Sequence, residues 1–164
     1  MPPRRSPPVA TAEGLIDGIL SASRALVAVA ARSLASVADD VSLAQYRVLV
    51  ELASRGPLRA ADLAQALHVD RSTATRMCDR LYRKRLVRRR RLVEDRRGVL
   101  ISLTGAGRDL VAEVSRRRRG EIAQIVERMP ASHRGWVTDA LRAFAEAAGE
   151  VPEPDWSLGW DLAR

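Results

Sequence analysis

The chain has 164 residues, of which 46% are hydrophobic but only 4% aromatic, and its formal net charge is +8 at pH 7. This length fits one domain with appended helices, and a hydrophobic content dominated by Ala, Leu and Val favours helices over strands. The single cysteine excludes an intrachain disulfide and favours a reducing cytoplasm, while no uninterrupted apolar run approaches the roughly 18 residues of a membrane span, so no membrane partner is expected.

The N-terminal part of the chain predicts an arm followed by a long helix. Residues 1–10 are Pro-rich and basic, and we expect them to be disordered, with contact to DNA phosphates as the alternative. Residues 11–38 predict one helix, capped by Thr11 and apolar around so much of its girth that it needs cover on more than one side. Because one small domain cannot supply that cover, we expect a second subunit.

The next elements have the spacing of a helix-turn-helix. Residues 43–54 predict a helix capped by Ser42, Leu58 predicts a short strand, and residues 60–66 predict a short helix. A turn then leads to Asp70, a good N-cap for a polar helix. The side chains expected to face the core are Leu43, Tyr46, Leu49, Val50, Leu52, Leu63 and Leu67.

The positive charge is concentrated in residues 71–97. This segment holds 12 of the 28 Lys and Arg residues and only three acidic ones, so its net charge is +9 while the rest of the chain is −1. Such a segment should bind a polyanion. At helical spacing, Ala74, Met77, Cys78 and Leu81 fall on one face, and hydroxyl and Arg side chains fall on the other. An exposed face of that kind suits the major groove of DNA.

Two strands are predicted after this helix, over residues 86–93 and 98–103. The polar turn 94–98 between them places Arg96 and Arg97 at its tip. A helix followed by such a ribbon is the layout of a winged helix-turn-helix. The alternative is that the arginine run is only a solvated face, but the charge coincides with a capped helix and a turn, which favours DNA binding.

The C-terminal part predicts two helices and a tail. Thr104 opens a long helix that carries the solvated arginines 116–119, and Pro130 breaks it. Ser132 is the expected cap of the last helix, whose inward side chains would be Trp136, Val137, Leu141 and Phe144. Residues 149–164 form a tail with Trp156 and Trp160, for which packing, a ligand cleft and a sticky tail all stay open.

Four stretches carry a resemblance to a known family: VSLAQYRVLVEL, ADLAQALHVDRSTATRMCDRL, LVRR and EDRRGVLISLTGAG. Over roughly residues 11–148 the chain resembles the MarR (multiple antibiotic resistance regulator) family of bacterial transcription factors. The resemblance implies a mostly α (α+β) winged helix-turn-helix, with a DNA-binding lobe at residues 39–103 and dimerisation helices at 11–38 and 104–148. It also implies a cytoplasmic, ligand-responsive repressor that binds a pseudo-palindromic operator in double-stranded DNA as a homodimer. The effector would be a small lipophilic or phenolic molecule, and no cofactor is implied.

The resemblance also implies site residues. The DNA-binding positions are Arg71, Ser72, Thr73, Thr75, Arg76, Arg80, Arg96 and Arg97. Asp95 would orient the wing arginines beside it. One departure concerns Arg85, which stands where the family commonly has Gly between the recognition helix and the wing. Either Arg85 adopts a strained left-handed conformation, or this helix ends differently.

Three rival interpretations have less support in the sequence. An enzyme has little support, because His68 and His133 have no acidic or thiol partner at metal spacing and there is no Gly-rich phosphate loop, so neither catalysis nor a metal site is expected. A sequence-indifferent architectural or RNA-binding protein would fit the charge but not the hydroxyl-bearing helix face. A redox-sensing regulator would use Cys78, but its place on the apolar face favours a core role.

Overall fold

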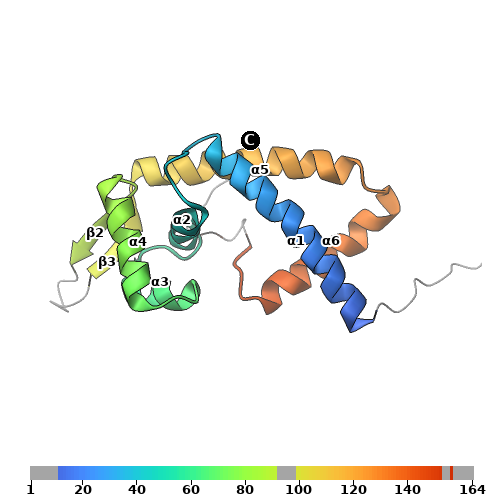
Figure 1. Cartoon of the computed structure of the whole chain (residues 1–164), viewed down its shortest axis with the longest axis horizontal. Helices are drawn as coiled ribbons and strands as arrows, with labels where there is room; N and C mark the ends of the chain where they lie inside the picture. The colour runs from blue at the N-terminus through green and yellow to red at the C-terminus, as the bar shows by residue number, and fades with distance from the viewer. Residues whose placement is uncertain (1–10, 92–98, 153–155, 157–164) are drawn as a thin grey trace, which may run out of the picture.

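The computed structural model describes residues 11–91, 99–152 and 156, and the fold is stated for those residues. Its elements are α1 (Ala12–Ala35), α2 (Leu43–Arg55), β1 (Leu58–Arg59), α3 (Ala60–Ala66), α4 (Arg71–Arg83), β2 (Val87–Arg91), β3 (Val99–Leu103), α5 (Gly105–Glu127) and α6 (Ala131–Ala147). The helices α2 to α4 and the strands form a lobe at one end of the molecule (Figure 1). Helix α5 runs from this lobe to the opposite end, where the chain turns into α6 (Figure 1).

The strands form a small antiparallel sheet in the order β1-β3-β2. Leu58 pairs with Ile101, and β2 and β3 pair from Val87 opposite Leu103 to Arg91 opposite Val99. The predicted strand at Leu58 and the predicted two-stranded ribbon are therefore confirmed. The turn 94–98, with Asp95, Arg96 and Arg97, lies outside the described residues.

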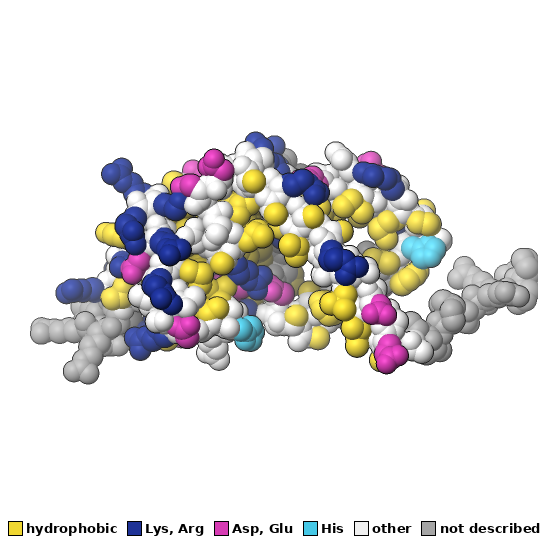
Figure 2. Space-filling model, viewed as in Figure 1, with side chains coloured by type: hydrophobic (Ala, Val, Ile, Leu, Met, Phe, Trp, Pro, Cys, Tyr) yellow, Lys and Arg dark blue, Asp and Glu magenta, His cyan; other side chains and the backbone are white. Residues whose placement is uncertain are grey.

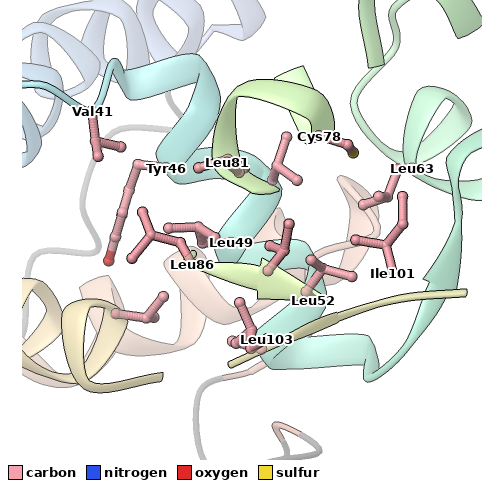
Figure 3. Close-up of a cluster of buried hydrophobic side chains, with 14 of the residues drawn as sticks. Val41, Tyr46, Leu49, Leu52, Leu63, Cys78, Leu81, Leu86, Ile101 and Leu103 are labelled. Carbon is pink, nitrogen blue, oxygen red and sulfur yellow. The ribbon is translucent and has the colours of Figure 1, made fainter. Parts of the chain in front are cut away.

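The hydrophobic core of the lobe lies between α2, α3, α4 and the sheet (Figure 3). The predicted core residues Tyr46, Leu49, Leu52 and Leu63 are buried. Leu43 is exposed, which contradicts the prediction. As the first residue of α2, it lies off the helix face that carries Leu49 and Leu52, so no part of the core reaches it.

Polar side chains begin four of the helices as predicted. The side-chain oxygens of Thr11, Ser42, Asp70 and Thr104 each accept a hydrogen bond from a backbone N–H in the first turn that follows. The last helix is an exception, because α6 begins directly after Pro130 with no side-chain cap. The chain is already helical at Ala131, so Ser132 lies inside the first turn and is not placed to cap it. The prediction of Ser132 as the cap is therefore wrong.

Helix α6 exposes three of the four side chains that were predicted to face inward, and the fourth, Val137, is half-buried. Trp136 is 58% exposed, Leu141 56% and Phe144 51%. Helix α1 likewise exposes Leu15 and Ile16, as expected for a helix that one domain cannot cover. Hydrophobic side chains accordingly show on the surface of α1 and around α6 in the space-filling view (Figure 2). The periodicity of α6 identified its apolar face correctly, but this chain alone supplies no surface to cover it.

Helix α1 is long and apolar enough to cross a membrane if only length and composition are considered. This corrects the expectation from sequence, which counted uninterrupted apolar residues and so stopped at Asp17 and Arg24. The C-terminal part of α1 packs within the fold: Val29 and Leu34 are buried, and the Arg32 guanidinium lies 2.8 Å from a carboxylate oxygen of Glu121 in α5. These contacts show that the C-terminal part of α1 packs against the rest of the folded chain.

Candidate nucleic-acid interface

Helix α4 begins with a network of hydrogen bonds around Asp70. Its carboxylate accepts hydrogen bonds from the Thr73 backbone N–H at 2.9 Å, the Thr73 hydroxyl at 2.7 Å and the Ser72 hydroxyl. These bonds stabilise the charged carboxylate and hold the pKa of Asp70 well below its ordinary value. The start of α4 is therefore fixed before any ligand binds.

The hydroxyl groups on α4 already donate to partners within the helix. Besides Ser72 and Thr73, the Thr75 hydroxyl donates to the Arg71 carbonyl at 2.8 Å. Arg76 donates from Nη2 to the Thr73 hydroxyl oxygen at 3.1 Å. The sequence placed these hydroxyls on the helix face expected to meet DNA. In the structure they stiffen the helix start, and they offer mainly their oxygen lone pairs to an incoming group.

The two faces of α4 are divided as predicted. Ala74, Cys78 and Leu81 are buried, and Met77 is half-buried. The candidate residues on the other face are exposed, apart from the half-buried Thr73: Arg71, Ser72, Thr75, Arg76 and Arg80. Lys and Arg side chains gather over the end of the molecule that holds α4 and β2 (Figure 2). The candidate residues of α4 therefore lie together on one exposed, basic surface.

The chain leaves α4 through a left-handed residue. Arg85 has φ +59°, so of the two alternatives for this position the strained one is observed. The backbone N–H of Leu86 donates to the Leu81 carbonyl at 3.0 Å and that of Arg85 donates to the Tyr82 carbonyl at 2.9 Å, which together make a Schellman motif. His68, with φ +53°, ends α3 by the same motif and makes the turn before α4.

The base of the wing is tied to α4 by a side chain that sequence reasoning did not single out. Arg89 of β2 forms an ion pair with Asp79 of α4, and its guanidinium carbon lies 5.1 Å from the centre of the Tyr82 ring. A usable signal was strand alternation: Arg89 shares a strand face with the buried Val87, which turns both towards α4. The neighbouring Arg88 points to the other face and donates to the Ser102 hydroxyl at 3.1 Å.

Cys78 has the environment of a core residue. Its side chain is fully buried in the lobe (Figure 3), and burial raises the pKa of its thiol to about 11. A thiol that stays protonated at neutral pH is a poor nucleophile and a poor metal ligand. Within the described ranges, no group of three His, Cys, Asp or Glu side chains is arranged to hold a metal ion.

The tail returns from α6 to the lobe. Trp156 is buried in the core cluster, and its indole N–H donates to the Val151 carbonyl at 3.0 Å. For Trp156 the structure therefore supports packing among the three readings left open, whereas Trp160 lies outside the described residues. The same return brings Glu150 into an ion pair with Arg47 of α2.

Comparison with known proteins identifies relatives over most of this fold. The family model described as the MarR family matches residues 41–99. The repressor MdtR of Bacillus subtilis is 33% identical over 114 residues, which are 66% of this chain and 72% of MdtR. Across the curated relatives compared, the matched part spans between 41% and 72% of the relative's length.

Solved structures extend the likeness over most of the chain. The structure of RV1404 from Mycobacterium tuberculosis is 42% identical with a TM-score of 0.81, covering 87% of this chain and 97% of that one. FabT of Streptococcus pneumoniae, solved in complex with DNA, is 21% identical with a TM-score of 0.67 over 82% of this chain and 95% of its own, so it supports the fold alone. On these matches, this chain belongs to the MarR family and has the winged helix-turn-helix fold.

Proposed function

We propose that this chain is a sequence-specific, double-stranded-DNA-binding transcriptional regulator. The observation that carries the proposal is the exposed face of α4, where Thr75, Arg76 and Arg80 project from a helix start fixed by Asp70. The run of arginines in β2, on the same lobe, adds positive charge beside it. Curated relatives named as transcriptional regulators, and MdtR named as a repressor, support the choice of a repressor over an enzyme.

In the proposed docking, α4 enters the major groove and the wing reaches a flanking minor groove. Arg76 and Thr75 reach base edges, since they lie near the start of the exposed helix face. Arg71, Ser72, Thr73 and Arg80 contact the same groove or its phosphates. Arg96 and Arg97 serve the wing, with Asp95 orienting them.

We propose further that the protein acts as a homodimer. The exposed Trp136, Leu141 and Phe144 of α6, together with the exposed apolar residues of α1, support this, because apolar patches on that scale mark an interaction surface. Two copies of α4 related by a two-fold axis would bind a pseudo-palindrome with half-sites about 10 bp apart. A small lipophilic or phenolic effector and a cytoplasmic location complete the proposal, as the family resemblance implies.

Selection of binding sites from random duplexes tests the central proposal. The purified protein should enrich one pseudo-palindromic motif and bind it far more tightly than a scrambled duplex of the same composition. Replacing Arg76 with Ala should cost roughly 1–3 kcal/mol on that operator and less on scrambled DNA, because a base contact is lost. Equal affinity of the wild type for operator and scrambled DNA would favour the sequence-indifferent alternative.

A second variant, Arg97→Ala, tests the wing. Since the minor groove code is degenerate, this change should weaken binding to all duplexes more evenly, with a mild bias towards A·T flanks. The plot of log affinity against log salt should flatten by about one phosphate per lost contact, or about two per dimer. If affinity and salt slope are both unchanged, the wing does not engage DNA and this docking is wrong.

A further inference from the structure

Asp79 is the one acidic residue of α4, in a helix that also carries Arg71, Arg76, Arg80 and Arg83. It follows Thr75 by four residues and Arg76 by three, so it shares the exposed face that carries the candidate DNA contacts. A carboxylate there repels DNA phosphates and weakens any attraction that depends on charge alone. Its presence on this face therefore calls for a role other than direct DNA binding.

The carboxylate of Asp79 holds one arginine of the wing. Its ion-pair partner Arg89 is fixed a second time by the Tyr82 ring, 5.1 Å below its guanidinium carbon. The Asp79 and Arg89 side chains are 41% and 36% exposed, so both are in contact with solvent. Exposed ion pairs contribute little to folding stability, so stability alone does not account for this arrangement.

The pair stands between the recognition helix and the wing. A helix in the major groove and a wing in the next minor groove lie on either side of one sugar–phosphate strand, so a guanidinium placed between them is within the region where phosphates pass. A free Arg89 would supply a contact that is the same for every sequence, because phosphates carry no base information. Paired with Asp79, the same guanidinium already has an anionic partner.

We propose that Asp79 is a positioning residue that limits the affinity of the protein for DNA, because it holds Arg89 against Tyr82 and so withholds a sequence-indifferent phosphate contact. This inference rests on the proposed function and adds a repulsive element to it. Specificity is a difference between two binding free energies, so a contact that is the same for every duplex changes both affinities and leaves their ratio unchanged. Asp79 therefore lowers the affinity for all duplexes, and the base contacts of α4 decide the preference for the operator.

The test compares Asp79→Asn with a matched control, Asp40→Asn. Asp40 forms an ion pair with Lys84, which lies at the end of α4 away from the Asp70 cap. Asp40→Asn therefore makes the same change in net charge as Asp79→Asn and also frees a cation. Affinities are measured on operator and scrambled duplexes at several salt concentrations. Asp79→Asn should bind scrambled DNA about five-fold more tightly, and its salt slope there should steepen by about 0.9 per protomer. Its affinity for the operator should rise by about the same factor, so the ratio of the two affinities is kept, whereas Asp40→Asn, whose partner Lys84 lies at the far end of α4, should change both affinities less.

The double variant Asp79→Asn/Arg89→Gln decides the mechanism. If the released Arg89 causes the added binding, removing its charge should return the affinities for both duplexes to near the wild-type values. A double variant that binds DNA as tightly as Asp79→Asn would overturn the inference, as would affinities of Asp79→Asn equal to those of the wild type. Equal weakening of both duplexes by Asp79→Asn would also overturn it, because that pattern indicates a purely structural role. A wild type that does not distinguish operator from scrambled DNA would instead overturn the proposed function, and this inference with it.

Discussion

Replacing Gly107 with Ala should destabilise the protein, although Ala is the better helix former. Gly107 lies in the first turn of α5, and a Cβ atom there would lie 2.1 Å from the Leu86 carbonyl oxygen and 3.3 Å from the Leu103 side chain. The same carbonyl oxygen accepts hydrogen bonds from the Thr104 backbone N–H and the Thr104 hydroxyl, both at 3.1 Å. Because this oxygen is backbone and is held by those bonds, α5 would have to move away from the end of α4.

The size of the effect follows from two opposing contributions. Exchanging Gly for Ala within a helix gains about 1 kcal/mol, whereas forcing an extra carbon into a closed site costs about 1–3 kcal/mol. Contact with fixed backbone places Gly107 at the upper end of that cost, so we expect a net loss of about 2 kcal/mol and a fall in Tm of about 4–8 °C. Gly120 of the same helix is the matched control, because nothing lies within 4 Å of its added Cβ.

Urea unfolding, followed by circular dichroism at one fixed protein concentration, measures both variants. The fixed concentration matters because association would add to the apparent stability. Gly120→Ala should gain about 0.5–1 kcal/mol through helix propensity alone. If Gly107→Ala matched the wild type or gained as much as Gly120→Ala, the close approach of α5 to Leu86 would not be the rigid contact described above.

Further changes test Cys78 in the core, the exposed face of α6 and Trp156 in the tail. Native Cys78 should resist alkylation at pH 8, since burial raises the pKa of its thiol to about 11. Because this pKa is raised in the folded state, the protonated thiol contributes fully to the free energy of unfolding below its ordinary pKa of 9.0, and this contribution declines towards pH 11. Cys78→Ala should remove that decline. Peroxide should affect operator binding by the wild type and by Cys78→Ser in the same way, and a difference would contradict the core role. Phe144→Glu should give a monomer at micromolar concentration by light scattering, whereas Arg142→Glu, on the opposite side of α6, should stay dimeric; a wild type that is already monomeric would refute the proposed dimer. Trp156→Ala should lower the free energy of unfolding by about 3 kcal/mol, and a loss below about 1 kcal/mol would show that its burial contributes little.

The helix starts could be read from sequence because their chemistry is local. Thr11, Ser42, Asp70 and Thr104 each accept a bond from an N–H three residues on, so the pattern in a few adjacent letters decides the outcome. The faces of α4 were predictable for a similar reason, since helical spacing alone separates Cys78 from Arg76. The fold and the exposed face of the candidate site could be predicted from these local rules.

Predictions that depended on which part of the fold packs against a residue were less successful. Phe144 was expected to be inward because α6 is amphipathic, but periodicity does not say whether the covering surface belongs to the same chain. The ion pair of Arg89 with Asp79 was not foreseen, because it requires the relative position of β2 and α4. For Arg85 the sequence offered two alternatives, and the left-handed one is observed because the Schellman bonds from Leu86 and Arg85 hold the end of α4 in that form.

Helix α6 is connected to the lobe on both sides along the chain, and the second connection could not be predicted from the sequence. The first is α5, which runs continuously from the lobe towards α6 (Figure 1). The second is the return of the tail to α2, where Arg47 pairs with Glu150 and Arg55 donates to the Gly149 carbonyl at 2.9 Å. Both arginines also pair with the buried carboxylate of Glu51, which orients them towards the tail. Since α2 packs on α4 through the shared core, the exposed apolar face of α6 and the exposed basic face of α4 belong to one mechanically connected unit.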